Sequence, residues 1–194
     1  MLVKTINIIN PFKSLNNTRE HIEYTDDWVI ELASYYSGVK VPWVPTREEF
    51  IEVALDAAQV GPGDVVYDLG CGDGRIVIAA AKRGAKAVCV EINPDLLSRA
   101  MENARKAGVD HLIKFVQEDF TKVDLSDATV VYMYLLTSVN EMLKPKLAKE
   151  LKKGTRIISL DFVITGWKEV KTIRVSSPAR SGTYYLYIIG YSDR

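Results

Sequence analysis

The chain has 194 residues, of which 47% are hydrophobic, enough for one domain with a buried core. Its 25 basic and 25 acidic residues give a formal net charge of zero, so the whole chain lacks the positive field typical of proteins that bind nucleic acids or anionic membranes. No segment approaches the ~20 uninterrupted apolar residues of a membrane-spanning helix, and residues 1–20 lack the apolar core of a signal peptide. We therefore expect a cytoplasmic protein with no membrane partner, and we do not expect nucleic acid as a partner.

Residues 1–40 are read as an N-terminal extension with one helix. The segment 26–36 has a candidate N-cap and apolar residues at helical spacing, and we expect it to pack on the domain or over the mouth of its binding site. Residues 41–194 form the main domain.

Short β-branched runs alternate with helical patterns from residue 46 onward, an order typical of a parallel sheet covered by helices on both faces. The expected helices lie near 46–59, 73–83, 93–107 and 138–152, with the last broken or restarted at Pro145. The expected strands lie at 65–70, 86–92, 113–119, 128–136 and 155–163.

Two further strands, 168–176 and 182–191, are joined by a link too short for a crossover helix, so they must pair antiparallel. The fold class is therefore α/β: a Rossmann-like, doubly wound sheet of seven strands, with five parallel strands and a C-terminal antiparallel pair. A dinucleotide-binding fold would instead have six parallel strands.

Glycines at 70, 72 and 74 follow the first expected strand and precede a helix. Glycine permits a positive φ and a close approach of the backbone to a ligand, while the helix directs free N–H groups toward the same place. Asp68 and Asp73 would repel a pyrophosphate but suit a cationic group. The alternative is a tight strand-to-helix turn that binds nothing.

Acidic residues also close the next two strands. Glu91 ends the second strand, where its carboxylate can accept hydrogen bonds from ribose hydroxyls, and Asp119 ends the third, where it can accept a bond from an adenine amino group while Phe120 flanks the ring. Asn93 follows Glu91 and doubles as the N-cap of the next helix. Three acids at successive strand ends favour a nucleoside cofactor.

The two cysteines, Cys71 and Cys89, have no C-x-x-C spacing, so we expect neither a disulfide framework nor a zinc site, and a reducing compartment is the simplest setting. The two histidines, His21 and His111, stand apart from potential partner ligands. We therefore expect no metal site and no histidine-based mechanism.

The Asp-x-Gly-x-Gly-x-Gly run resembles the first motif of seven-strand methyltransferases that use S-adenosylmethionine, a cofactor with an ammonium and a sulfonium but no phosphate. Four segments together resemble the archaeal protein-lysine methyltransferases, relatives of mitochondrial lysine methyltransferases that carry a membrane anchor; the segments are 41–46, 67–75, 90–93 and 135–147. Where the anchored relatives have an apolar segment, this chain is polar.

This resemblance implies an S-adenosylmethionine-dependent N-methyltransferase that acts on lysine side chains of protein substrates. It implies that the cofactor is held by the residues of the strand-end and glycine motifs: Thr46, Asp68, Gly70, Gly72, Gly74, Glu91, Asn93, Asp119 and Phe120.

A lysine acceptor must lose a proton before methyl transfer, and a desolvating aromatic mouth lowers the pKa of an amine. We expect Trp43, Tyr132 and Tyr134 to form that mouth, although Tyr132 and Tyr134 share one strand face and could simply be core. All three depart from the residues expected in the family.

The alternative functions are a methyltransferase of a small molecule or RNA, and a module that binds S-adenosylmethionine without catalysis. An NAD(P) oxidoreductase is disfavoured by the glycine spacing. The basic residues between 144 and 156 could form an RNA-contacting face, but their interleaving with Glu141 and Glu150 favours a solvated helix surface.

Overall fold

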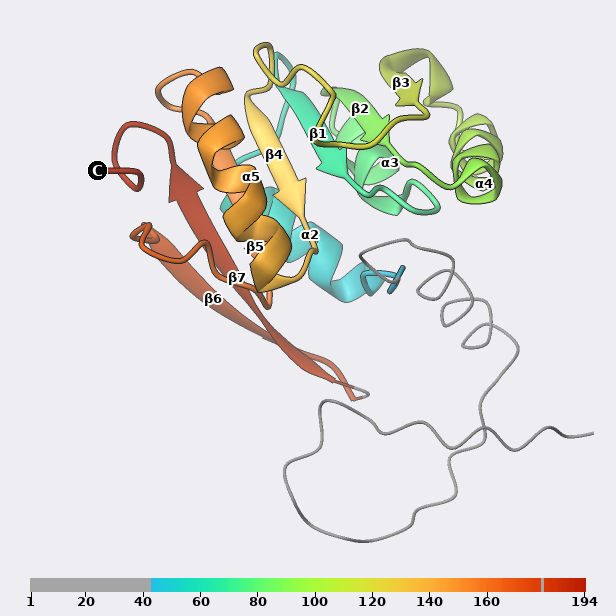
Figure 1. The fold of residues 1–194 in the computed structure, drawn as a ribbon. Helices are drawn as coiled ribbons and strands as arrows, with labels where there is room; N and C mark the ends of the chain where they lie inside the picture. Colours follow the sequence, from blue (N-terminus) through green and yellow to red (C-terminus); the bar gives the residue numbers. More distant parts are fainter. Residues whose placement is uncertain (1–42, 179) are drawn as a thin grey trace, which may run out of the picture.

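The computed structural model describes residues 43–178 and 180–194. The expected extension 1–40, its helix at 26–36 and the domain boundary at 41 lie outside these residues. The described chain forms a seven-stranded sheet in the order β3-β2-β1-β4-β5-β7-β6 (Figure 1). The strands are β1 Val65–Leu69, β2 Lys86–Val90, β3 Ile113–Val116, β4 Val130–Met133, β5 Arg156–Leu160, β6 Lys171–Ser176 and β7 Ser181–Ile188.

Strands β1 to β5 pair only in parallel with one another, whereas β7 is antiparallel to both of its neighbours, β5 and β6. The expected fold class, with five parallel strands and a terminal antiparallel pair, is therefore confirmed. The strand order reverses between β1 and β4, and the crevice at such a reversal is where open parallel sheets bind ligands.

Helices cover both faces of the sheet (Figure 1). The helices are α2 Glu48–Ala57, α3 Arg75–Lys82, α4 Pro94–Lys106 and α5 Thr137–Glu150, with a 3-10 turn, η1, at Asp110–Leu112. Helices α2, α3 and α4 contribute to one core cluster, and α5 contributes to the other. Strand side chains alternate between them: Val130 and Tyr132 join the first cluster, and Val131 and Met133 the second.

Helix α5 runs without a break through Pro145, so the expected interruption there was wrong. A proline inside a helix removes one backbone hydrogen bond and costs about 3 kcal/mol. Leu143 and Leu147 flank the proline and are fully buried against the sheet, and burying two leucines offsets that cost.

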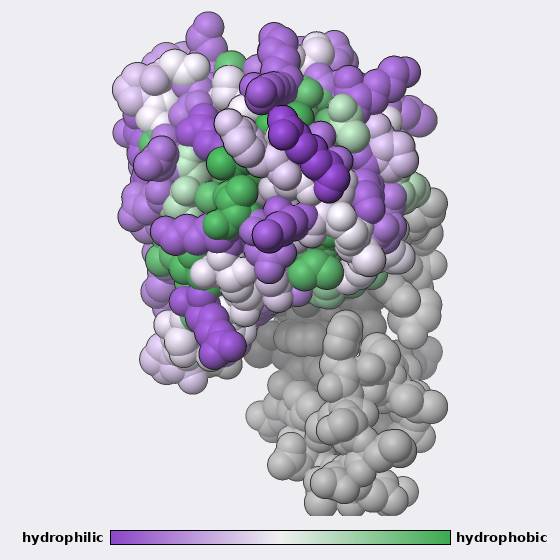
Figure 2. Space-filling model, turned by 90° about the vertical axis from the view of Figure 1, so that its left-hand side faces the viewer, coloured by the Kyte–Doolittle hydropathy of each residue, from purple (hydrophilic) through white to green (hydrophobic). Residues whose placement is uncertain are grey.

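The strands are shorter than expected at their carboxyl ends, so Asp119 lies in the loop beyond β3 and Tyr134 directly after β4. At the other end of the sheet, the edge strand β6 exposes Lys171, Thr172, Arg174 and Ser176. Figure 2 shows this side of the molecule as mainly hydrophilic, with hydrophobic side chains in small separate patches. Charged edges of this kind disfavour pairing with another chain.

Candidate functional site

A cavity of about 250 Å³ opens beyond the carboxyl ends of β1, β2 and β4. Ten of the twelve residues assigned to the site from the sequence line it: Trp43, Thr46, Asp68, Gly70, Glu91, Asn93, Asp119, Phe120, Tyr132 and Tyr134. The other two, Gly72 and Gly74, belong to the same loop but are not part of the cavity wall.

Gly72 and Gly74, the two glycines that do not line the cavity, are needed for close packing of the loop. Gly72 has a φ of +54°, and a Cβ there would lie 1.9 Å from Nε1 of Trp43. Gly74 has a φ of +82°, and a Cβ there would lie 2.9 Å from the Cβ of Ala100 in α4. Any side chain at either position would displace a neighbour and strain the backbone.

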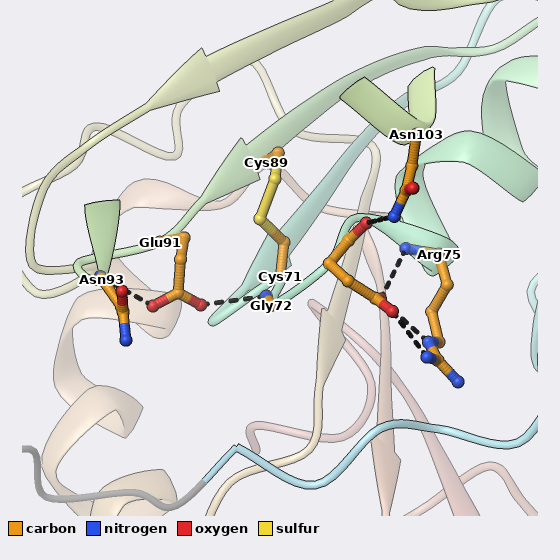
Figure 3. Close-up of a disulfide and its surroundings, with 8 residues drawn as sticks. Cys71, Gly72, Arg75, Cys89, Glu91, Asn93 and Asn103 are labelled. Atoms are coloured by element: carbon orange, nitrogen blue, oxygen red, sulfur yellow. Dashed lines mark hydrogen bonds and ion pairs between the residues drawn. A yellow bond between two sulfur atoms is a disulfide. The ribbon is translucent and has the colours of Figure 1, made fainter. Parts of the chain in front are cut away.

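Glu91 fixes the glycine loop through its carboxylate (Figure 3). One oxygen accepts the Gly72 N–H at 2.9 Å and the other accepts the Asn93 N–H at 2.9 Å, and the residue is 7% exposed. Each carboxylate oxygen keeps a further lone pair for a ligand hydroxyl. Asn93 Oδ1 accepts the Asp95 N–H at 2.9 Å, which confirms Asn93 as the N-cap of α4.

A disulfide joins Cys71 to Cys89, so the expectation that the two cysteines are unpaired was wrong (Figure 3). The pairing arises because β1 and β2 are adjacent, with Asp68 opposite Cys89, and the Cα atoms of the two cysteines lie 5.3 Å apart. The bond ties the glycine loop to β2, the strand that directly precedes Glu91. The expectation of a reducing compartment therefore loses its basis.

Asp73 does not face a ligand as an isolated charge. Its carboxylate accepts two hydrogen bonds from the Arg75 guanidinium, at 2.9 and 2.6 Å, and Arg75 also donates to the carbonyl of Thr46 at 2.8 Å. Arg75 thus offsets the charge that was expected to flank the cofactor and ties the loop to residues 43–46. The preference of this part of the cavity for a positively charged ligand therefore depends on Asp68 and Glu91.

Asp68 is a carboxylate with no donor among the described residues. It is 3% exposed, and burial raises its pKa well above the ordinary value, with the charges of Glu91 and Asp73 acting in the same direction. A buried carboxylate is costly unless it is paired. A ligand that brings an ammonium group would supply this pairing, so the site fits a cationic amino-acid moiety and does not fit a pyrophosphate.

Asp119 and Phe120 lie on the β3 side of the cavity. One oxygen of Asp119 accepts the N–H and the hydroxyl of Thr121, at 2.9 and 2.8 Å, which fixes the carboxylate in an Asx-type turn. Phe120 is the next residue in the chain, so a carboxylate and an aromatic ring lie side by side at the cavity.

The three aromatic residues differ in accessibility. Tyr132 is 2% exposed, and its hydroxyl is bonded to Thr46 Oγ1 at 3.0 Å and to the Tyr184 hydroxyl at 3.3 Å. Tyr134 and Trp43 are half-buried. Tyr132 therefore serves both the core and the cavity wall, whereas Tyr134 and Trp43 keep accessible ring surface.

An apolar rim completes the cavity, and the sequence reasoning missed it. Val44, Ile92 and Met142 are between 40% and 51% exposed and all line the cavity. Ile92 directly follows Glu91, so the assignment of Glu91 to the site could have indicated Ile92 as well. Nothing in the sequence brings Met142 of α5 to the same place.

Within residues 43–178 and 180–194, no cluster of three or more histidine, cysteine, aspartate or glutamate side chains is arranged to hold a metal ion. Over the same residues, no helix has the length and hydrophobicity needed to cross a bilayer.

Comparison with known proteins places the site in a family. Residues 68–171 match the family model of the ANTKMT methyltransferase domain. A protein-lysine N-methyltransferase of Saccharolobus islandicus is 52% identical over 152 residues, which cover 77% of this chain and 94% of the relative. The adenine nucleotide translocase lysine N-methyltransferase of Mus musculus is 36% identical over 70% of this chain, and the match covers 59% of the mouse protein.

A solved structure agrees with this placement. The crystal structure of an RNA methyltransferase from Salinibacter ruber, in complex with S-adenosyl-L-homocysteine, is 44% identical and superposes with a TM-score of 0.72, over 75% of this chain and 94% of the other. From the family model and the level of identity, this chain belongs to the ANTKMT methyltransferase family.

Proposed function

We propose that the protein transfers methyl groups from S-adenosylmethionine to the ε-amino groups of lysine residues in other proteins. The observation that carries the cofactor assignment is the buried Asp68 carboxylate, which lines the cavity and finds no donor among the described residues. The acceptor assignment rests on the protein-lysine methyltransferases to which the chain is 52% and 36% identical.

The bound cofactor supplies an electrophilic methyl group on a positively charged sulfur. The residues divide its recognition between them: Asp68 pairs with the ammonium group, Glu91 accepts hydrogen bonds from the ribose, and Asp119 with Phe120 holds the adenine. Gly70 lets the backbone approach the ligand, while Gly72, Gly74 and Thr46 hold the loop and the adjoining segment in place. Asn93 keeps the Glu91 carboxylate oriented through its N–H.

The acceptor side needs a neutral amine and the exclusion of water. Trp43 and Tyr134 offer ring surface at the cavity, and an amine that loses water against these rings has a lowered pKa. Rings of this kind also attract an alkylammonium product by cation–π contact. Tyr132 contributes by holding Thr46, since its hydroxyl is engaged within the core.

RNA is the second candidate acceptor, because the Salinibacter ruber structure is described as an RNA methyltransferase. The charge distribution favours protein. Lys146 is paired with Glu150, Lys144 donates to the carbonyl of Thr165, and Arg156 is paired with Asp64, so three of the basic residues between 144 and 156 are engaged within the chain. Phosphate contacts by lysine and arginine dominate nucleic-acid affinity.

The test is methylation with isotope-labelled S-adenosylmethionine, using the protein and RNA fractions of a cell extract as separate acceptors. Mass spectrometry of the protein fraction is expected to place the label on lysine ε-nitrogens. Trp43→Ala and Tyr134→Ala should lower turnover more than cofactor affinity, because both residues serve the acceptor. Label confined to RNA or to small metabolites would refute the lysine assignment while leaving the cofactor assignment intact.

A further inference from the structure

A cluster of three side chains beside the cavity joins three segments at the carboxyl edge of the sheet. Tyr134 follows β4, Asp161 follows β5 and Arg180 precedes β7. Nη1 of Arg180 donates to the Tyr134 hydroxyl oxygen at 2.5 Å, and Nη2 donates to Oδ2 of Asp161. The guanidinium also lies 5.6 Å from the centre of the Tyr134 ring, within the range of a cation–π contact.

The backbone of Asp161 is held in an uncommon conformation that serves this cluster. Its φ is +62°, in the left-handed region that costs a non-glycine residue free energy. Two hydrogen bonds with Thr183 hold it there: the Asp161 N–H donates to the Thr183 carbonyl at 2.7 Å, and Oδ1 accepts the Thr183 N–H at 2.8 Å. The other carboxylate oxygen is thereby directed to Arg180.

The neighbouring glycine leaves space for this ion pair. A Cβ at Gly182 would lie 2.9 Å from Oδ1 of Asp161 and 3.2 Å from Nη2 of Arg180, so a larger residue would press on both partners. The start of β7 is thus shaped to accommodate the Asp161–Arg180 pair.

Tyr134 is the member of the cluster that lines the cavity. Because its hydroxyl oxygen accepts from a guanidinium that Asp161 holds, the orientation of the ring depends on both charged residues. Asp161 also balances the charge of Arg180, so the pair presents no net charge to an approaching ammonium. Burial raises the pKa of Tyr134 and the guanidinium acts against that rise, so the ring stays a neutral phenol at neutral pH.

We infer that Arg180 and Asp161 are positioning residues that hold the Tyr134 ring at the acceptor side of the cavity, so that the lysine amine is aligned for methyl transfer. This inference rests on the proposed function. It assigns alignment of the acceptor to Asp161 and Arg180, neither of which is among the residues that line the cavity. Misplacing a reacting group by about 1 Å can cost ~100-fold in rate, so a ring that is free to turn should slow turnover.

The experiment compares Arg180→Gln, Arg180→Lys, Tyr134→Phe and the double variant Arg180→Gln/Tyr134→Phe. The acceptor is a cell-extract protein fraction freed of nucleic acid, and turnover is followed with labelled S-adenosylmethionine. Arg174→Gln is the matched control, since Arg174 lies on the same hairpin and is exposed. Calorimetric titration gives cofactor affinity, and thermal unfolding gives the melting temperature.

Arg180→Gln is expected to lower kcat by about 10- to 100-fold while the Kd for the cofactor changes less than about twofold. Arg180→Lys should recover part of the loss, because it restores the charge but not the forked geometry. The double variant should be no slower than the slower single variant, since both changes remove the same contact.

Full turnover in Arg180→Gln would overturn the inference, and so would additive losses in the double variant. A parallel loss of cofactor affinity and melting temperature would assign Arg180 a purely structural role and overturn it as well. If the unaltered chain places no methyl group on lysine, the proposed function fails. If the unaltered chain methylates lysine and Arg180→Gln does so equally well, only the inference about Arg180 fails.

Discussion

Replacing Asp68 by asparagine is expected to weaken cofactor binding and at the same time stabilise the fold. Asp68 is 3% exposed, and burial, followed by the charges of Glu91 and Asp73, raises the pKa of its carboxyl group. Between the ordinary aspartate pKa of about 4 and the raised value, the folded chain holds a proton that the unfolded chain has released. The free energy of unfolding therefore falls as the pH rises through this interval. Asparagine does not titrate, so this decrease in the free energy of unfolding should be absent from the variant.

Cofactor binding should show the opposite pH dependence. A cationic ammonium pairs with the ionised carboxylate, so affinity should increase as the pH rises through the raised pKa of Asp68, and binding below that pKa should release a proton. A hydrogen bond between charged groups contributes about 1.5–3 kcal/mol. The variant should therefore bind S-adenosylmethionine roughly 10- to 150-fold more weakly.

Two measurements check this prediction. Calorimetry in buffers of different ionisation enthalpy reports both the affinity and the proton released. Chemical unfolding over a series of pH values above the ordinary aspartate pKa of about 4 reports how stability changes as Asp68 titrates. Asp110→Asn is the matched control, because Asp110 is exposed and does not line the cavity. If Asp68→Asn binds the cofactor as tightly as the unaltered chain and keeps the same slope of stability against pH, the assignment of Asp68 is refuted.

Three other predictions follow from the contacts of the glycine loop. Glu91→Gln should weaken cofactor binding by about 10- to 100-fold in a calorimetric titration, whereas Glu102→Gln, an exposed change on α4, should not. Reduction of the Cys71–Cys89 disulfide, which closes a loop of 18 residues, should lower the free energy of unfolding by about 3 kcal/mol in urea, and a chain with both cysteines changed to alanine should not respond to the reductant. Gly72→Ala should displace Trp43 and lower turnover, and its effect should be smaller when Trp43 is already alanine; equal effects in both backgrounds would contradict this.

The order of the elements and the position of the cavity could be predicted because they depend on local pattern. Alternating strand and helix signals specify a doubly wound sheet, and the carboxyl ends of its parallel strands meet at one edge. Asp68, Glu91 and Asp119 could therefore be assigned to one place from their spacing alone, and all three line the cavity.

The features that were missed depend on the register between strands or on side chains that lie far apart in the sequence. The disulfide requires Cys89 to lie opposite Asp68 on β1, a pairing that spacing does not reveal. The pairing of Asp73 with Arg75 is local, but the choice between a partner two residues away and a ligand depends on the rotamer. The contact of Arg180 with Tyr134 requires β7 to lie beside β5. The effect of Pro145 was predicted wrongly, because the burial of Leu143 and Leu147 outweighs the tendency of proline to interrupt a helix.

The two sides of the cavity are held by different kinds of interaction, and this difference has a functional consequence. On the cofactor side, the glycine loop is fixed by backbone hydrogen bonds to β2, by Glu91 and by a covalent bond. On the acceptor side, Tyr134 is held by a guanidinium that depends on one carboxylate. A loop fixed by a covalent bond and backbone hydrogen bonds moves less after a substitution than a side chain held by a single ion pair. Substitutions near Tyr134 should therefore alter turnover and acceptor choice without disturbing cofactor affinity. Relatives with different acceptors can then diverge at the ends of β4, β5 and β7 while the loop after β1 stays the same.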